Sequence, residues 1–239
     1  MKKRLIINAD DFGMSKAVNY GIIQAYKDGI VTSTSIMSNM ESFEHGVDML
    51  KNNMNLGVGI HLNITLGYPL TQAKSLINEK GVFTKKNFCK PNVEEVKIEF
   101  IAQIEKALKS GIRIDHIDGH HHIHQIDSLK DLVKELSDIY DLPIRGDMKA
   151  SHGENEACLL TEFFENGATI KKFNDIIKNL KEDITYDLMC HPAYLDTDII
   201  RYSSYIKHRL KEYDILTSEQ AKQILIDNDV ELITYRLLR

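Results

Sequence analysis

The sequence predicts an α/β fold, a distorted (β/α) barrel of about seven parallel strands, in a single domain over residues 1–239. Short apolar runs alternate with longer amphipathic runs along the chain, which is typical of parallel strands covered by helices. Roughly seven such repeats within 239 residues favour a barrel over an open doubly wound sheet. No G-x-G-x-x-G or P-loop pattern follows an expected strand, which argues against a nucleotide cofactor.

The first half of the chain provides three expected strands and three expected helices. The strands are apolar runs, whereas the helices carry apolar residues at a spacing of three or four. In chain order we expect a strand at 4–9, a helix at 15–28, a strand at 31–38, a helix at 42–53, a strand at 56–64 and a helix at 93–111. Gly111 ends the last of these helices.

The second half continues the alternation. We expect a strand at 112–120, a helix at 126–140, a short strand at 142–147, a strand at 184–192, helix-like segments at 197–212 and 217–228, and a closing segment at 230–236. Pro192 ends the expected strand at 184–192. The segments 65–92 and 147–168 are long loops with aromatic residues and glycine, and long loops in a compact domain are often binding loops.

Composition and charge argue against several classes of partner. The net charge of −5 gives no reason to expect nucleic acid or an anionic membrane. No apolar run approaches the roughly 20 residues of a membrane span, and the start "MKKRLIINADDFG" is too polar for a signal peptide. Cys89, Cys158 and Cys190 are odd in number and widely spaced, which suits a reducing compartment. We therefore expect a cytoplasmic protein.

Polar side chains stand at the C-terminal ends of four expected strands. Asp10 and Asp11 end the first strand, and His61, His120 and His191 come at or near the ends of three later ones. Barrel and doubly wound enzymes place their chemistry at these strand ends. Two imidazoles and one carboxylate can hold a divalent cation and leave positions open for water and substrate. The sequence therefore predicts a catalytic metal site there.

Simpler interpretations of the same residues stay open. The aspartate pair could cap the helix that begins near Ser15. A single histidine at a strand end is more often a hydrogen-bonded structural residue than a ligand. The stretch "HIDGHHHIH" (116–124) holds five of the ten histidines, and His121, His122 and His124 need not all be functional.

Five sequence blocks resemble, in order, the motifs of the YdjC/ChbG carbohydrate deacetylases. They are "LIINADDFGMSKAVNYGI", "GIHLNITLGYPL", "HIDGHHHIH", "IRGD" and "LMCHPAYLD", and the resemblance runs from residue 4 to about 220. It implies a barrel similar to the NodB-type polysaccharide deacetylases and a divalent metal. It also implies removal of acetyl groups from N-acetylated mono- or oligosaccharides, chitooligosaccharides in the best-known branch, by a protein that forms a homodimer.

The resemblance also implies a role for each matching position. The metal ligands would be Asp11, His61 and His120, the general base Asp10, the general acid His191, and the partner that keeps the base charged Arg145. Ligand chemistry alone favours zinc or another transition ion such as manganese over magnesium. The resemblance implies magnesium, so we expect Mg²⁺ first and Zn²⁺ or Mn²⁺ as alternatives.

The expected chemistry is hydrolysis of an acetamide. The cation would polarise the carbonyl, Asp10 would take a proton from water, and His191 would protonate the departing amine. Asp10 and Asp11 point to opposite faces of a regular strand, so we expect a bend near Phe12–Gly13. Asp187, on the face that also carries His191, could stabilise the imidazolium. A metal-dependent sugar isomerase and a non-catalytic metal- or sugar-binding protein remain the alternatives.

Overall fold

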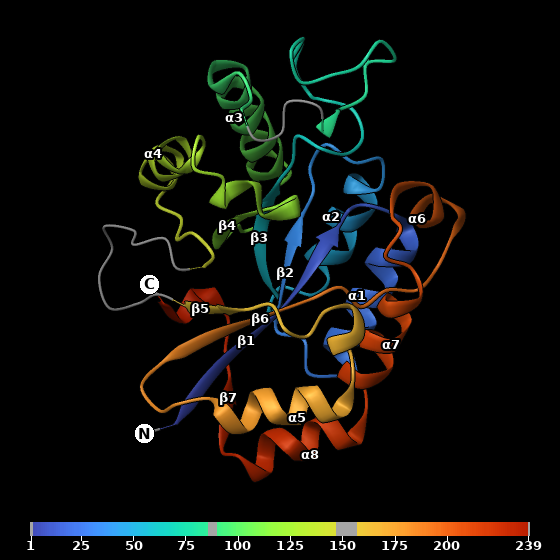
Figure 1. Cartoon of the computed structure of the whole chain (residues 1–239), viewed down its shortest axis with the longest axis vertical. Helices are drawn as coiled ribbons and strands as arrows, with labels where there is room; N and C mark the ends of the chain where they lie inside the picture. The colour runs from blue at the N-terminus through green and yellow to red at the C-terminus, as the bar shows by residue number, and fades with distance from the viewer. Residues whose placement is uncertain (1, 86–89, 147–156, 239) are drawn as a thin grey trace.

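The computed structural model describes residues 2–85, 90–146 and 157–238 (Figure 1). Seven strands form one sheet in the order β4-β3-β2-β1-β6-β5, with β7 also beside β1, and all these pairs are parallel. The strands are β1 Lys3–Phe12, β2 Ser33–Ile36, β3 Gly57–Leu62, β4 His116–Gly119, β5 Ala157–Leu160, β6 Thr185–Cys190 and β7 Val230–Leu232.

Strand β1 is the centre of the sheet. One edge pairs with β6 over residues 4–9, while the other pairs with β7 over residues 3–5 and with β2 from residue 8 onward. The sheet is a curved half-barrel. Among the described residues no ladder joins β4 to β5, so the half-barrel stays open on that side. The predicted α/β fold with about seven parallel strands is confirmed, and the open side is its distortion.

Helices cover the outside of the sheet, with α5 and α8 packed together at one end (Figure 1). They are α1 Lys16–Lys27, α2 Phe43–Lys51, α3 Val93–Lys109, α4 Lys130–Tyr140, α5 Ile170–Asn179, α6 Thr197–Tyr202, α7 Lys207–Leu216 and α8 Glu219–Asp227, with 3₁₀ turns η2 His120–Gln125, η3 Glu165–Gly167 and η4 Tyr235–Leu238. Most buried apolar side chains of strands and helices form one continuous core.

Helix α1 does not use the aspartate pair as its cap. The hydroxyl of Ser15 accepts the backbone N–H of Val18, which is the usual N-cap contact. Asp10 and Asp11 are therefore not the cap of this helix, and the capping interpretation of the pair is wrong.

The stretch 112–120 differs from the predicted strand. Only His116–Gly119 pairs with β3, because the chain before it is held differently: the carboxylate of Asp115 accepts the N–H of Val58 at 3.1 Å. The 3₁₀ turn η2 begins directly after β4, where we expected a loop, and α4 begins at residue 130 rather than 126. In the expected strand 142–147, Ile144 forms a single parallel bridge with Ile117, and Asp147 lies outside the described residues.

One strand and one α-helix were not predicted. Strand β5 lies in the segment 147–168, of which residues 147–156 are outside the described part of the chain. Helix α5 buries Phe173, Ile176 and Ile177, a helical spacing that we did not assign from the sequence. The helical segment 197–212 is two helices, α6 and α7, separated by the segment 203–206 that enters the site described below.

No helix in the described residues is long and apolar enough to cross a bilayer. Cys190 is a free thiol, and Cys89 lies outside the described ranges. Cys190 is fully buried in the core, as expected.

Gly59 gives a test of how tightly β3 and β4 are packed beneath the site. A Cβ atom at this residue would lie 2.2 Å from Nε2 of His116, and the ring of His116 is itself stacked on Tyr235 at 4.0 Å. Gly59→Ala should therefore lower the free energy of unfolding by about 1–3 kcal/mol. Urea denaturation monitored by circular dichroism measures this change. An unchanged midpoint would show that the imidazole moves aside without cost.

Candidate active site

A bulge in β1 brings the two adjacent carboxylates to the same site. The ladder with β2 shifts register between Ala9 and Phe12, and Asp11 has a φ of +75°, an unusual conformation for a residue other than glycine. Gly13 follows with a φ of +91°, which glycine adopts without strain. The predicted bend is present, and it begins at Asp11, one residue earlier than expected.

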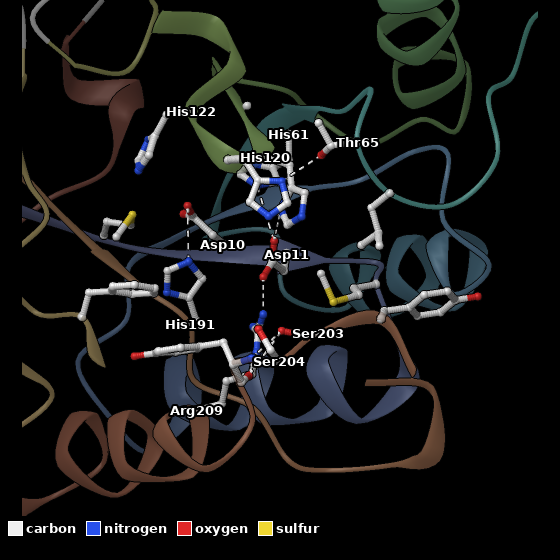
Figure 2. A pocket seen from close by; sticks show the side chains of 18 of the residues that line it. Asp10, Asp11, His61, Thr65, His120, His122, His191, Ser203, Ser204 and Arg209 are labelled. Carbon is white, nitrogen blue, oxygen red and sulfur yellow. Dashed lines mark hydrogen bonds and ion pairs between the residues drawn. The ribbon is translucent and has the colours of Figure 1, made fainter. Parts of the chain in front are cut away.

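The three expected ligands converge on one point. Oδ1 of Asp11 lies 3.5 Å from Nε2 of His61 and 2.9 Å from Nδ1 of His120, and the three ligand atoms lie within 4.8 Å of one another. Figure 2 shows the two imidazoles side by side above the Asp11 carboxylate. These side chains come from the ends of β1 and β3 and from the residue after β4.

The donor set fits a divalent cation. Asp11 Oδ1 is buried and accepts no well-formed hydrogen bond from any described residue, although two imidazole nitrogens face it. Nδ1 of His61 lies 2.7 Å from Asp118, a carboxylate contact typical of metal-binding histidines, and this leaves Nε2 to face Asp11. Burial lowers the pKa of His61, but Asp118 and Asp11 together raise it to about 10, so a cation would replace a proton on this ring.

Arg209 holds the second oxygen of Asp11. Its Nη2 donates to Asp11 Oδ2 at 2.6 Å (Figure 2), and the arginine side chain is buried beside it. Burial raises the pKa of Asp11, but the charges of Arg209 and His120 outweigh it and hold that pKa well below its usual range. Asp11 is therefore charged at neutral pH.

Arg145 lies under the site and contacts three aspartates. Its Nη1 lies 2.6 Å from Asp10 and 3.0 Å from Asp118, and its Nε lies 2.8 Å from Asp187. Only 1% of the residue is exposed. Burial lowers the pKa of this guanidinium, but the three carboxylates raise it further, so the cation stays charged. The expected contact between Arg145 and Asp10 is present.

Asp187 is not placed to stabilise His191. Its carboxylate is bound by Arg145 and by the hydroxyl of Tyr235, which donates at 2.5 Å. The carboxylate beside His191 belongs instead to Glu212 of α7, which accepts the backbone N–H of His191 and lies 3.9 Å from its Nδ1. Burial raises the pKa of Glu212 to about 8.

His191 follows the last residue of β6 and faces the general-base candidate. Its Nε2 lies 4.0 Å from Oδ2 of Asp10, and Figure 2 shows the ring on the opposite side of the Asp10 carboxylate from His122. Burial lowers the pKa of His191 to about 4, although Asp10 and Asp11 act in the opposite direction. The resting imidazole is therefore neutral at pH 7.

The four histidines of the run 120–124 point in different directions. His121 and His122 both have a φ of +55°, and this left-handed turn directs their side chains differently from that of His120, although the rings of His120 and His121 stay in contact with centroids 4.0 Å apart. His121 contacts the hydroxyl of Thr65 at 2.8 Å, whereas His122 lines the cavity and His124 is buried without a hydrogen-bond partner among the described residues. Only His120 of this run belongs to the ligand group.

Several of these side chains line one cavity of about 600 Å³. Its wall includes carboxylates and imidazoles together with aromatic and hydroxyl side chains, among them Asp10, Asp11, His61, His120, His191, Arg209, Phe164, Tyr205, Ser203 and Thr161. Four residues at the site were not predicted from the sequence, namely Arg209, Glu212, Tyr205 and Phe164. Arg209 and Glu212 lie in a helix rich in charged residues, so nothing in the sequence separates them from the solvent-exposed ones.

The model of the family described as "YdjC-like protein" matches residues 4–227. The chain belongs to this YdjC-like family. Two curated relatives are both named "Carbohydrate deacetylase". The protein from Clostridium beijerinckii is 42% identical, covering 98% of this chain and 99% of its own length. The protein from Geobacillus stearothermophilus is 37% identical, covering 99% and 98%.

Solved structures agree on the fold. A protein from Enterococcus faecalis V583, provisionally described as a cellobiose-phosphate cleavage protein, has a TM-score of 0.91 and 32% identity, covering 100% of this chain and 99% of its own. The peptidoglycan deacetylase PdaC from Bacillus subtilis has a TM-score of 0.55 at 14% identity, covering 99% and 90%. At that identity the second likeness concerns the fold alone, which matches the expected NodB-like architecture.

The ligand group predicts which single changes remove a metal. Asp11→Ala, His61→Ala and His120→Ala should each lose most of the bound divalent ion, because each removes one of three converging donors. Metal analysis of the dialysed proteins measures this, and circular dichroism checks the fold.

His121→Ala is the matched control, because this neighbouring imidazole faces Thr65 rather than Asp11. Its metal content should stay close to that of the unmodified protein. Full occupancy in His120→Ala would remove His120 from the ligand set.

Proposed function

We propose that this protein is a metal-dependent carbohydrate deacetylase that hydrolyses the acetamide of N-acetylated sugars such as chitooligosaccharides. The observation that carries the proposal is the arrangement of Asp10 and His191 beside the group Asp11, His61 and His120 in one cavity. A binding protein needs no such base and acid. Membership of a family whose curated relatives are named carbohydrate deacetylase supports the same reaction.

The cation would be held by Asp11, His61 and His120. When bound there, a divalent ion supplies Lewis acidity toward an amide carbonyl and a water molecule. Two imidazole nitrogens and one carboxylate are a donor set typical of zinc or manganese, whereas magnesium, which the family resemblance implies, prefers oxygen. Adding Mg²⁺, Mn²⁺ and Zn²⁺ separately to the chelated protein distinguishes these alternatives.

We assign the role of general base to Asp10. Its Oδ1 is occupied by Arg145 at 2.6 Å and by the amide of Asn8 at 2.9 Å, which leaves Oδ2 facing the cavity. These two contacts fix the orientation of the carboxylate, so that Oδ2 can accept a proton from the attacking water. Arg145 acts on the base and does not line the cavity.

His191 is placed to protonate the leaving amine. Because burial lowers its pKa to about 4, the imidazole must receive its proton during the reaction. Oδ2 of Asp10 lies 4.0 Å from Nε2 of His191, beyond direct hydrogen-bond reach, so a bridging water would carry the proton from Asp10 to His191, which then passes it to the sugar nitrogen. The amine leaves more readily once it is protonated.

A single catalytic domain, a homodimeric assembly and a cytoplasmic location are further predictions of the proposal. Release of acetate from N-acetylglucosamine oligomers of different length is the direct test. A sugar isomerase would convert its substrate without releasing acetate, and a binding protein would retain the sugar unchanged.

Asp10→Asn tests the base. The amide keeps the size of the carboxylate but cannot accept the proton, so kcat for acetate release should fall by about 10²–10⁴-fold. Metal content should be preserved, because Asp10 lies outside the group Asp11, His61 and His120. Asp127→Asn, at a side chain that is 95% exposed, is the matched control and should leave kcat unchanged. A fall below about tenfold would contradict the assignment of Asp10 as base.

His191→Ala tests the acid by comparing an amide with an ester. Turnover of the N-acetylated sugar should fall strongly, whereas turnover of an aryl acetate should fall much less, because a phenolate leaves without a proton. His45→Ala, outside the cavity, serves as control and should leave the turnover of both substrates unchanged. Equal losses on amide and ester would show that His191 is not the leaving-group acid.

A further inference from the structure

Phe164 is unusual among the phenylalanines of this protein. Its exposed fraction is 36%. The other phenylalanines in the described residues are at most 4% exposed, namely Phe12, Phe43, Phe83, Phe100, Phe163 and Phe173. Phe164 lines the cavity that contains the metal-ligand group. Leaving a phenyl ring exposed forgoes burial energy, so its position in a cavity wall points to a ligand that covers it.

The ring of Phe164 belongs to a stack of three rings. It is stacked on Tyr205 at 4.5 Å with an interplanar angle of 12°, and Tyr205 is stacked on His208 at 5.1 Å and 18°. All three side chains line the same cavity. Because Tyr205 covers one face of Phe164, the other face is the one available to a bound molecule.

Tyr205, the central ring of the stack, is anchored by hydrogen bonds. The hydroxyl of Tyr205 donates to the buried carboxylate of Glu212 and accepts the backbone N–H of Glu165 at 2.9 Å. Glu212 also accepts the backbone N–H of His191, so the stack and the proposed acid share one anchor. A rigid surface loses little conformational entropy when a ligand binds.

The stack lies beside the proposed acid. Ring centroids of both Phe164 and Tyr205 are 5.5 Å from the centroid of His191. In the proposed reaction the sugar amine is the leaving group, and His191 protonates its nitrogen. The pyranose ring that carries this nitrogen must therefore lie next to His191, where the aromatic stack is.

We propose that the free face of Phe164 is the platform on which the pyranose ring of the substrate lies. A pyranose has hydroxyls around its edge and C–H groups on its faces, so it matches an apolar ring bordered by polar groups. Such groups line the cavity here, namely Thr161, Ser203, Ser204 and His208. The inference rests on the proposed function and makes Phe164 a specificity-determining residue for the sugar, with no part in the proton transfers.

Phe164→Leu tests the platform. It removes the aromatic face and keeps an apolar side chain, so KM for an N-acetylglucosamine oligomer should rise about 3- to 10-fold, with kcat changed much less. KM and kcat for a small aryl acetate should stay within about twofold, because that ester has no pyranose ring.

Two variants serve as controls. Phe164→Tyr keeps the aromatic face and should retain the wild-type KM for the oligomer. Tyr20→Leu removes an aromatic residue that is 51% exposed and does not line the cavity, so KM and kcat for both substrates should stay unchanged. An unchanged KM in Phe164→Leu, or equal losses on oligomer and aryl acetate, would overturn the proposal.

Calorimetric titration with the same oligomer separates the platform from the deacetylase activity. If the wild-type protein binds the oligomer without releasing acetate, and Phe164→Leu binds it about 3- to 10-fold more weakly, the proposed function fails and the platform stands. If acetate is released and both proteins bind equally, the platform is wrong and the proposed function stands. If the wild-type protein neither binds nor cleaves the oligomer, both are wrong.

Discussion

The buried guanidinium of Arg145 is the interaction on which the rest of the site depends. Asp10, Asp118 and Asp187 come from three different strands, and each is at most 4% exposed. Three carboxylates in so small a buried region would repel one another strongly, and Arg145 contacts all of them within 3.0 Å. Removing one partner of such a group leaves an uncompensated buried charge, which is far costlier than losing a surface pair.

Each of the three aspartates that Arg145 fixes helps to orient another part of the site. Asp118 contacts Nδ1 of His61 and so orients the Nε2 atom toward the ligand group. Asp10 is held with one oxygen toward the cavity. Asp187 accepts the hydroxyl of Tyr235, which ties the C-terminal turn η4 to the centre of the sheet. Arg145, the buried cation beneath the cavity, thus fixes the orientation of the proposed ligand His61, of the proposed base Asp10 and of the C-terminal turn η4.

A second set of contacts reaches the site from α7 and the segment before it. The segment that runs from residue 203 into α7 brings Arg209 to Asp11 and Glu212 to the backbone of His191. The β1 bulge, with Asp11 at a positive φ, is unfavourable for an isolated chain and persists because these contacts over-determine it. Strained backbone also appears at His121 and His122, directly after the proposed ligand His120, and His121 there contacts the hydroxyl of Thr65.

The parallel α/β fold, most of its elements and the strand ends at which Asp10, Asp11, His61, His120 and His191 meet can be predicted from residue spacing alone. Alternation along a strand and the common direction of parallel strands are local properties, so residue spacing is enough to predict them. Which buried polar side chains face each other depends on the three-dimensional packing: Arg209 with Asp11, Glu212 beside His191, and Asp187 with Tyr235. These partners are far apart in the chain, and a charged residue in a polar helix carries no local sign that it will be buried.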